Sequence, residues 1–395
     1  MGLRTIDGLG EVAGLRVFVR ADLNVPLTDG GVGDDSRIRA TLPTLNELLG
    51  AGARLVVASH LGRPKGQVKE ELRLAPVAAR LRELLGREVV SVPDVVPLSL
   101  PDADIVLLEN LRFDPREEAN DPAFAGALAE LVDAYVDDAF GAVHRAHASV
   151  SALPELMLAS GRPAVAGRLL QREVEVLSRL LTDPQRPYVA ILGGAKVSDK
   201  LAVIDALIDR VDALLIGGAM AFTLLAAEGA DVGRSLVEAD RLDDVRAARA
   251  KAVERGVLIE LPSDVVAASE ISADVPRQTV PSREIPRDLM GLDIGPRTVE
   301  EFARILADAG TVLWNGPMGV FELEPFSAGT RGVAMAIGGS SSFSVVGGGD
   351  SLAAVTRAGL EDSFDHLSTG GGASLEFLEG RRLPGITILE DGDPS

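Results

Sequence analysis

Short apolar runs alternate with amphipathic helical patterns along almost the whole chain, and this alternation limits the possible folds more than any other feature. Runs rich in valine, leucine and isoleucine occupy residues 15–20, 54–58, 105–108, 134–136, 188–192, 213–216, 258–261, 311–314 and 343–346. Helical periodicity is clear at 42–49, 76–85 and 240–255. Continuous apolar strands that alternate with helices are typical of parallel sheets covered on both faces. The sequence therefore predicts an α/β fold.

The stretch 167–181 is the best candidate for a boundary between two domains. It is charged and helical in period, and a proline-rich segment at 182–187 follows it and ends the helix. Beyond this point the alternation starts again, and 395 residues exceed what one hydrophobic core usually holds. We expect two Rossmann-like domains at 1–166 and 184–374, each a mainly parallel sheet flanked by helices, joined by a hinge helix at 167–183.

The balance of charge excludes several classes of partner. The chain carries 39 basic and 59 acidic side chains, so its formal charge is −20 and no overall field attracts nucleic acid or an anionic membrane. The absence of cysteine excludes disulfides and thiolate metal sites. The first twenty residues contain no apolar signal segment, and the longest uncharged apolar stretch, 213–227, is shorter than the ~20 residues that span a bilayer. We expect a cytoplasmic protein with neither nucleic acid nor membrane as partner.

In open parallel sheets, ligands bind beyond the carboxyl ends of the strands, so the residues that follow each apolar run are the most informative. In the first half these positions are rich in arginine, with Arg20, Arg37, Arg63, Arg112 and Arg145. Any one of them is most simply a solvated loop residue. Five together would repel one another without an anion, and guanidinium groups bind phosphate and carboxylate oxygens well. The pattern therefore predicts an anion pocket. For the histidines at 60, 144 and 147, a structural hydrogen bond and a ligand contact remain equal alternatives.

In the second half, glycine and lysine take the place of arginine. The run 188–192 leads into GGAKVSDK, whose Gly-Gly turn allows backbone N–H groups to approach a phosphate. Lys196 and Lys200 would lie one helical turn apart on one face of the following helix. The whole chain has only five lysines, so this pair indicates a phosphate site, although a chance pair is an equal alternative.

Three more glycine turns follow apolar runs, at 217–218, 347–349 and 370–372. The last one opens an apparent helix at 375–379, whose N-terminus would attract an anion. Asp350 is either the N-cap of a helix at 351–358 or, beside a phosphate loop, a ligand of Mg²⁺. An apolar slot near Met220 and Phe222 would suit a purine, with core packing as the alternative.

Other nucleotide and enzyme motifs are missing from the sequence. None of the five lysines follows a glycine, so there is no Walker A motif. The segment GLGEVA at 8–13 precedes the first strand, which argues against a dinucleotide-binding oxidoreductase. A second alternative is a binding protein that closes around an anion and catalyses no reaction. An arginine pocket in one domain and glycine–lysine loops in the other favour phosphoryl transfer between an anionic metabolite and a nucleotide, with water excluded by domain closure.

The sequence resembles the phosphoglycerate kinase family over essentially its whole length. The motifs that carry the resemblance include RADLNVP at 20–26, GGAKVSDKL at 193–201 and WNGPMGVFE at 314–322, with others at 60–64, 107–113, 137–149, 291–298, 347–351 and 368–378. The resemblance implies reversible, Mg²⁺-dependent phosphoryl transfer between 1,3-bisphosphoglycerate and ADP, giving 3-phosphoglycerate and ATP, by hinge-bending closure of a monomer. It also implies that residues 375–395 return to the first domain.

The resemblance also implies a role for each matching residue. Asp22 and Asn24 would hold the glycerate part of the substrate, and Arg37 and Lys196 would face the transferring phosphoryl group. The rest of the 3-phosphoglycerate site would be His60, Leu61, Gly62, Arg63, Arg112 and Arg145. The nucleotide site would be Gly194, Lys200, Gly217, Gly218, Asn315, Glu322, Gly348, Gly349, Asp350 and Ser351, with Mg²⁺ on Asp350 and Glu322 at the ribose. Gly370, Gly371 and Gly372 would offer N–H groups to the phosphoryl group. Leu23 and Ala219 depart from residues common in the family, phenylalanine and glycine.

Overall fold

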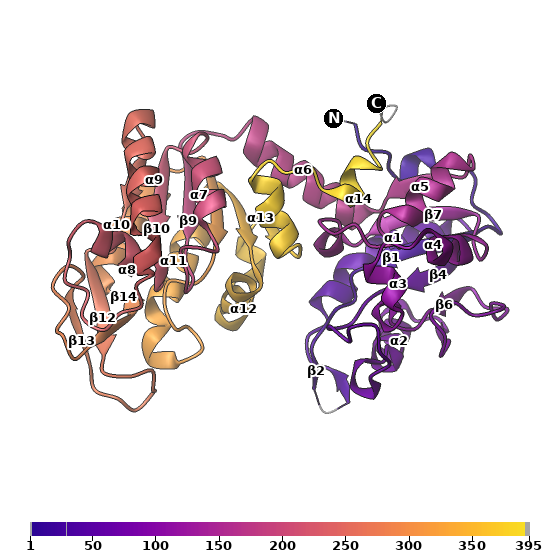
Figure 1. The fold of residues 1–395 in the computed structure, drawn as a ribbon, viewed down its shortest axis with the longest axis horizontal. Coiled ribbons are helices and arrows are strands. Elements are labelled where there is room, and N and C mark those ends of the chain that lie inside the picture. Colours follow the sequence, from indigo (N-terminus) through magenta and orange to yellow (C-terminus); the bar gives the residue numbers. More distant parts are fainter. Residues whose placement is uncertain (1, 29, 392–395) are drawn as a thin grey trace. The chain divides into compact units, whose positions relative to one another are not determined.

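The computed structural model describes residues 2–28 and 30–391, which divide into two compact units. The first unit comprises Met1–Glu175 together with Arg382–Ser395, and the second comprises Val176–Arg381 (Figure 1). The chain therefore leaves the first unit once and returns to it near its end. Within the described residues, no helix is both long enough and apolar enough to pass through a membrane.

The described part of the first unit contains a sheet of six parallel strands in the order β5-β6-β4-β1-β7-β8. Their bounds are Val90–Ser91 (β5), Ile105–Leu107 (β6), Arg54–Ala58 (β4), Arg16–Ala21 (β1), Ala134–Asp138 (β7) and Ala164–Ala166 (β8). Strand β1 lies between β4 and β7 and is buried on both faces, which explains why its sequence does not alternate between apolar and polar residues.

Helices cover both faces of this sheet. On one face, α1 (Ser36–Gly50) and α2 (Ala75–Leu85) pack against β1, and Leu45 and Leu81 join Val17 and Val19 in one core. On the other face, the ring of Phe18 stacks on Tyr135 with 5.7 Å between centroids. There α5 (Ala152–Ala159) contacts β7 and β8 and packs on α4 (Pro122–Ala129). The smaller elements are α3 (Pro115–Glu118), β2 (Leu27–Thr28), β3 (Gly31–Val32) and α14 (Pro384–Thr387).

The second unit repeats this architecture, with a sheet that is parallel throughout its described strands in the order β11-β10-β9-β15-β16-β17. The strands are Leu258–Glu260 (β11), Ala213–Ile216 (β10), Tyr188–Leu192 (β9), Thr311–Asn315 (β15), Phe343–Gly347 (β16) and His366–Ser368 (β17). The helices are Leu201–Ile208 (α7), Met220–Ala227 (α8), Leu242–Arg255 (α9), Pro296–Ala307 (α10), Ala328–Gly338 (α11), Gly349–Ala358 (α12) and Gly372–Leu378 (α13). Trp314 is fully buried in a core with Phe302 of α10 and Val333 of α11.

A small antiparallel sheet, in the order β13-β12-β14, adds to the second unit. It consists of Asp264–Ala268 (β12), Arg277–Pro281 (β13) and Met290–Ile294 (β14). The sequence analysis did not predict this sheet, because β13 is largely exposed and has no apolar run. Its strand β14 nevertheless supplies residues to the nucleotide cavity described below.

Helix α6 (Arg168–Thr182) starts in the first unit and ends in the second. Its N-terminus is held by the buried Asp138 at the end of β7, whose Oδ1 accepts hydrogen bonds from the N–H groups of Leu169 (2.9 Å) and Leu170 (3.3 Å). At the other end of the chain, the Arg4 N–H donates to the Leu389 carbonyl (2.8 Å). Helix α13 belongs to the second unit, the segment from Arg382 belongs to the first, and residues 392–395 of the predicted returning segment lie outside the described residues.

The predicted fold class is confirmed, and the apolar runs match strands to within about two residues at each end. Helix α1 begins six residues before the predicted position, because its first turn carries polar residues that hide the apolar period. Arg37 therefore lies in the first turn of this helix. The prediction had placed it in the loop before the helix. Strands β8 and β17 were not predicted, because neither contains two consecutive bulky apolar residues.

Candidate functional site

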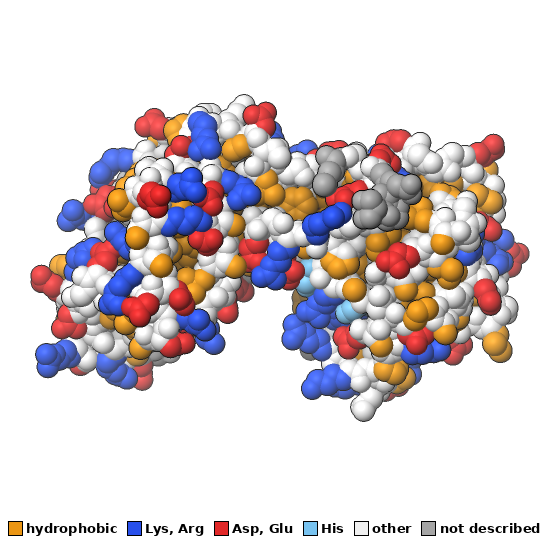
Figure 2. All heavy atoms as spheres, turned by 45° about the horizontal axis from the view of Figure 1, so that its top comes forward, with side chains coloured by type: hydrophobic (Ala, Val, Ile, Leu, Met, Phe, Trp, Pro, Cys, Tyr) orange, Lys and Arg blue, Asp and Glu red, His pale blue; other side chains and the backbone are white. Residues whose placement is uncertain are grey.

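The predicted basic residues of the first unit come from neighbouring strands. Arg20 lies near the end of β1, His60 follows β4, Arg112 follows β6 and Arg145 follows β7. These four strands are adjacent in the sheet, so their carboxyl ends form one edge. Figure 2 shows histidine atoms beside a group of Lys and Arg side chains on the surface of this unit. We call these four residues, together with Asp22, Asn24, Arg37 and Arg63, the anion pocket.

An acidic residue also belongs to the pocket. Asp22 is almost fully buried, and its Oδ2 accepts a hydrogen bond of 2.6 Å from Arg37 Nη1. A Cβ atom at Gly141 would collide with this carboxylate, so only glycine fits there. The Asn24 side chain accepts from the Gly62 N–H at 2.9 Å and ties the loop after β1 to the loop after β4. The neighbouring Leu61 is buried.

The remaining arginines differ in exposure. Arg112 is buried and donates from Nη1 to the Gly62 carbonyl (2.8 Å). Burial, reinforced by the Arg20 charge, lowers the pKa of Arg112 to about 10, although Glu118, whose Oε1 lies 3.5 Å from Arg112 Nε, acts in the opposite direction. Arg145 is half-buried and contacts His144. Arg63 is exposed and makes neither a hydrogen bond nor an ion pair with other described residues. Two buried or half-buried cations and one exposed cation therefore remain available to an anion.

Arg20 has a different environment from the other predicted arginines. It is fully buried, and all three of its nitrogens are engaged within the unit: Nε with Ser149 Oγ (2.8 Å), Nη1 with the Ala21 carbonyl (2.6 Å) and Nη2 with His60 Nδ1 (3.1 Å). Burial, and then the charge of Arg20, lowers the pKa of His60 well below its ordinary value, so the ring is neutral. Ser149 and its buried partner Glu117 were not predicted from the sequence as site residues, because neither follows an apolar run directly.

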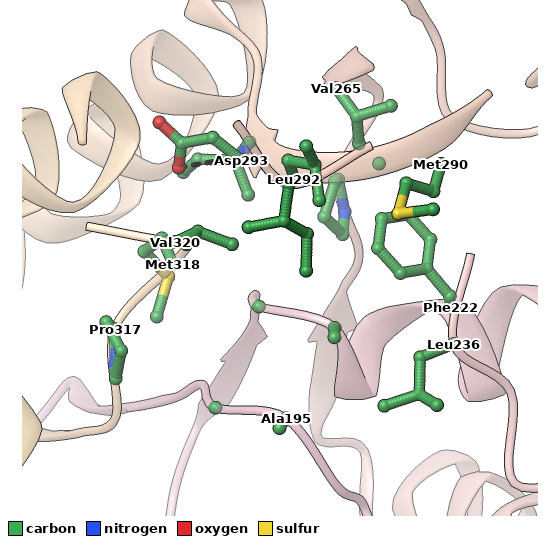
Figure 3. A pocket seen from close by; sticks show the side chains of 18 of the residues that line it. Ala195, Phe222, Leu236, Val265, Met290, Leu292, Asp293, Pro317, Met318 and Val320 are labelled. Atoms are coloured by element: carbon green, nitrogen blue, oxygen red, sulfur yellow. Dashed lines mark hydrogen bonds between the residues drawn. The ribbon is translucent and has the colours of Figure 1, made fainter. Parts of the chain in front are cut away.

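The second unit contains a cavity of about 320 Å³ with mostly apolar walls. Figure 3 shows Phe222 of α8 beside Met290 of β14 on one side, with Met318 and Val320 on the other. Its other walls include Gly194, Ala195, Gly218, Ala219, Leu236, Pro262, Val265, Ile271, Leu292, Gly319, Glu322 and Asp350. Its size and apolar walls suit a purine ring. Phe222 lines this cavity as predicted, whereas Met220 is a buried core residue outside its lining.

The predicted glycine turns pack closely against one another. A Cβ at Gly193 would collide with the Pro317 carbonyl, and one at Gly218 would collide with the backbone of Gly194. Gly316 has a φ of +103° and would collide with Gly193 if it carried a side chain. Gly217 is restricted in the same way by the sulfur of Met318. These glycines are therefore required by contacts between the loops that form the floor of the cavity.

Lys196 and Lys200 lie in the segment that precedes α7, since this helix begins only at Leu201. The prediction that they share a helix face is therefore wrong. Lys200 is half-buried and its Nζ contacts Asn315 Oδ1. Burial lowers the pKa of Lys200 to about 8, although the charges of Asp199 and Asp350 act in the opposite direction. Lys196 is exposed. The Nδ2 atom of Asn315 is buried without a hydrogen-bond partner among the described residues.

Helix α12 begins at Gly349, and its N-cap is Gly348 with a φ of +92°. Asp350 therefore lies in the first turn of the helix, and its interpretation as the N-cap is wrong. The exposed Asp350 carboxylate lines the cavity, as does Glu322. Ser351 is buried and accepts a hydrogen bond of 2.6 Å from the Gly316 N–H, so its hydroxyl holds a loop in place.

The fourth glycine turn leads into α13, which starts at Gly372. The predicted start was residue 375. Gly371 has a φ of +55°, which favours glycine, and the hydroxyls of Ser368 and Ser374 bind each other at 2.7 Å across the turn. Gly370 is buried, Gly371 is half-buried and Gly372 is exposed. The turn presents backbone N–H groups at the carboxyl end of β17.

The described residues contain no group of three or more His, Cys, Asp or Glu side chains that could hold a metal ion by themselves. Asp350 is a single carboxylate beside a glycine turn. Mg²⁺ is commonly bound by one or two carboxylates together with substrate phosphates and water. The donor set therefore fits a magnesium ion that arrives with a nucleotide, and does not fit a resident metal centre.

Two α/β units, one with a basic anion pocket and one with an apolar cavity walled by glycine loops, define a phosphotransferase that acts on a small anionic metabolite. The family model described as phosphoglycerate kinase matches residues 6–381. A phosphoglycerate kinase of Thermomicrobium roseum is 54% identical over 98% of this chain and 99% of its own length. One from Salinispora tropica is 55% identical over 99% of this chain and 100% of its own.

Solved structures agree with these relatives. The structure of phosphoglycerate kinase from Coxiella burnetii has a TM-score of 0.88 at 42% identity, and covers 98% of both chains. That of phosphoglycerate kinase from Pyrococcus horikoshii has a TM-score of 0.85 at 32% identity, with the same coverage. The chain belongs to the phosphoglycerate kinase family. The predicted family, and with it the activity of an ATP:3-phosphoglycerate phosphotransferase in glycolysis, are confirmed.

Proposed function

We propose that the anion pocket of the first unit binds 3-phosphoglycerate and that the cavity of the second unit binds ATP or ADP with Mg²⁺. The observation that carries this division is the contrast between the two sites. The first collects buried and half-buried cations at one sheet edge. The second has apolar walls, flanking glycine loops and one lysine, Lys200, whose pKa is lowered by burial. A phosphorylated acid needs the first kind of site, and a purine nucleotide needs the second.

In the anion pocket, we assign His60, Arg63, Arg112 and Arg145 to the distal 3-phosphate. Leu61 and Gly62 form the loop that carries this phosphate, and Gly62 is held by Asn24 and Arg112. Asp22 and Asn24 bind the hydroxyl and carboxylate end of the substrate. Arg37 is positioned by its ion pair with Asp22, which leaves further guanidinium N–H groups for the transferring phosphoryl group.

In the second unit, we assign the glycine turn of Gly217 and Gly218, of which Gly218 lines the cavity, to the adenine, and Glu322 to the ribose. Lys200 and Asn315 contact the nucleotide phosphates, together with backbone N–H groups of Gly194, Gly348, Gly349 and Ser351. Asp350 holds Mg²⁺ with those phosphates. The bound ion would neutralise phosphate charge.

The reaction transfers the phosphoryl group of an acyl phosphate to the terminal oxygen of ADP. The P–O bond to the acyl oxygen breaks, the 3-phosphoglycerate carboxylate leaves, and a new P–O bond forms to the ADP oxygen. Arg37, Lys196 and the N–H groups of Gly370, Gly371 and Gly372 stabilise the charge on the moving group. Water must be excluded, so we propose closure of the predicted domains about the hinge helix at 167–183. We further propose a cytoplasmic monomer.

A coupled assay for ADP formation from ATP and 3-phosphoglycerate tests this proposal. ADP should form only when 3-phosphoglycerate and Mg²⁺ are both present. Glycerate, which lacks the distal phosphate, serves as the matched substrate control and should react with a much lower kcat/KM, because it loses the interactions with the anion pocket. Equal rates with glycerate would refute the assignment of this pocket, and ADP formation without Mg²⁺ would refute the role of Asp350.

A further inference from the structure

A chain of four buried polar residues leads into the anion pocket, where its last two members, Arg20 and His60, belong to the pocket itself. Both oxygens of Glu117 accept hydrogen bonds from Ser149, Oε2 from its N–H (2.9 Å) and Oε1 from its hydroxyl (2.6 Å). Ser149 Oγ in turn accepts from Arg20 Nε (2.8 Å), and Arg20 Nη2 contacts His60 Nδ1 (3.1 Å). Glu117, Ser149 and Arg20 are fully buried, and His60 is only 5% exposed. We call this set the Glu117 chain.

The hydrogen bonds of this chain fix which atoms carry protons. A guanidinium group only donates, so Ser149 Oγ must accept from Arg20 and its own proton must point to Glu117. Both oxygens of Glu117 then accept, which is the arrangement of an ionised carboxylate. Burial raises the pKa of Glu117 above its ordinary value, and the Arg20 charge and the two hydrogen bonds from Ser149 oppose this rise by favouring the charged form. The chain thus pairs one buried negative charge with one buried positive charge through a hydroxyl.

The same rule applies at the other end of the chain. Since Arg20 Nη2 only donates, the Nδ1 atom of His60 must accept and cannot carry a proton. The neutral ring therefore carries its proton on Nε2. No hydrogen bond to Nε2 is found within the described residues. His147 does not compete for Glu117, because its Nδ1 lies 3.9 Å from Oε1, too far for a hydrogen bond.

We propose that Glu117 is a positioning residue for the anion pocket. Through Ser149 and Arg20 it holds His60 as the neutral tautomer protonated on Nε2, which then donates to the phosphate bound there. Arg20 acts as the link that orients His60 and makes no contact with the ligand. This inference rests on the proposed function, because it takes the pocket to bind the 3-phosphate.

The first test needs no substitution and no substrate. Long-range ¹H–¹⁵N correlation spectra of the full chain labelled in its histidines report the protonated ring nitrogen, and His60→Gln assigns the His60 signals. We expect a protonated Nε2 and an unprotonated Nδ1 at neutral pH. A proton on Nδ1, or an imidazolium ring, would overturn the proposal.

The second test interrupts the chain at its far end. In Glu117→Gln the charge that compensates Arg20 is lost, and His60 should then populate both tautomers. The KM for 3-phosphoglycerate should rise roughly tenfold, as for the loss of one hydrogen bond to a charged group, while kcat and the KM for ATP stay near wild type. Ser149→Ala should have the same effect, and Glu130→Gln, an exposed glutamate of the same unit, is the matched control. A folded Glu117→Gln protein with the wild-type tautomer and KM would refute the proposal.

His60→Ala separates this inference from the proposed function. If His60→Ala leaves the KM for 3-phosphoglycerate unchanged, the assignment of His60 to the phosphate is wrong, whatever its tautomer. If His60→Ala raises this KM while Glu117→Gln and Ser149→Ala leave the tautomer and the KM unchanged, only the role of Glu117 is wrong. Should Glu117→Gln not fold, the wild-type spectrum together with Ser149→Ala decides the question.

Discussion

At Lys200, burial and the neighbouring carboxylates act in opposite directions on the pKa of the ammonium group. Its ammonium group is half-buried against Asn315, and burial lowers its pKa to about 8, so part of the population loses its charge in mildly alkaline solution. A lysine that binds phosphate needs this charge. The affinity of the second unit for nucleotides therefore depends on a proton that is lost within a pH range open to experiment.

We expect the Kd for ADP to be constant below about pH 7 and to rise above pH 8, as Lys200 in the free protein loses its proton. The sign follows because the charged form binds phosphate and the neutral form does not. Calorimetric titration from pH 6.5 to 9.5 measures this dependence. Lys200→Arg stays charged throughout and should show a flat profile. An identical rise in Lys200→Arg would show that another group is responsible.

Lys196 is exposed in the free protein, as expected of a side chain that contacts its target only during the reaction. Lys196→Ala should lower kcat by about 10²–10³, the usual loss when a group that stabilises transition-state charge is removed. Steady-state kinetics in both directions measures the effect. Lys251 is a half-buried lysine of α9 that pairs with Asp205 of α7, and it provides the control substitution Lys251→Ala. Wild-type kcat in Lys196→Ala would contradict its catalytic role.

Arg63 is the exposed cation at the rim of the anion pocket, and the phosphate that we assign to it does not change during the reaction. Arg63→Ala should therefore raise the KM for 3-phosphoglycerate about tenfold or more, with a smaller effect on kcat. The KM for ATP is the internal control, because it depends on the other unit. If only the KM for ATP changed, the division of substrates between the two units would be wrong.

At the scale of single elements, the start of helix α6 depends on one buried carboxyl group. Asp138 Oδ1 accepts both hydrogen bonds from the first turn, and Oδ2 has no hydrogen-bond partner among the described residues. Burial raises the pKa of Asp138 from 3.8 to about 7. Between these values the folded state binds more protons than the unfolded state, so this group makes the protein less stable as the pH rises.

Asp138→Asn keeps the accepting oxygen and removes the ionisation. At pH 8 it should raise the free energy of unfolding of the first unit by about 1–3 kcal/mol more than at pH 4, where the aspartate is largely protonated in the folded state and partly protonated in the unfolded state. Urea denaturation at the two pH values measures the difference. The comparison is Asp133→Asn, which makes the same change at an exposed aspartate of the same unit. A stabilisation that is equal at both pH values would contradict this account.

The elements that could be predicted are those whose burial is visible in their own sequence as a run of apolar residues. Strands such as β9 are buried on both faces and therefore read as apolar runs, and the arginines after them share one sheet edge by topology. The exposed β13 carries no such signal. Lys196 and Lys200 were predicted to lie on a helix because their spacing of four residues matches one helical turn. The sequence gives no sign that α7 begins only at Leu201. Glu117 was missed because its partner Ser149 lies 32 residues away, and only the fold brings them together.

For the whole molecule, the path of the chain links stability to function. The first unit is built from both ends of the sequence, and Leu389 near the C-terminus is fully buried in it. A net charge of −20 repels anionic substrates in general, so binding depends on local pockets that exist only when each unit is folded. Each substrate should therefore stabilise the unit that binds it.

Leu389→Ala tests whether the two units unfold in separate transitions. Truncation of a buried leucine costs about 2–5 kcal/mol, and here the cost falls on the first unit, although the substitution lies far along the sequence from its sheet. A ligand at about 100 times its Kd adds about 2.7 kcal/mol to the state that binds it. In calorimetric scans of Leu389→Ala, 3-phosphoglycerate should restore most of the lost Tm, whereas ADP with Mg²⁺ should mainly protect the transition of the second unit. Equal protection by both ligands would mean that the units unfold as one, and that the Leu389 contact stabilises the whole chain.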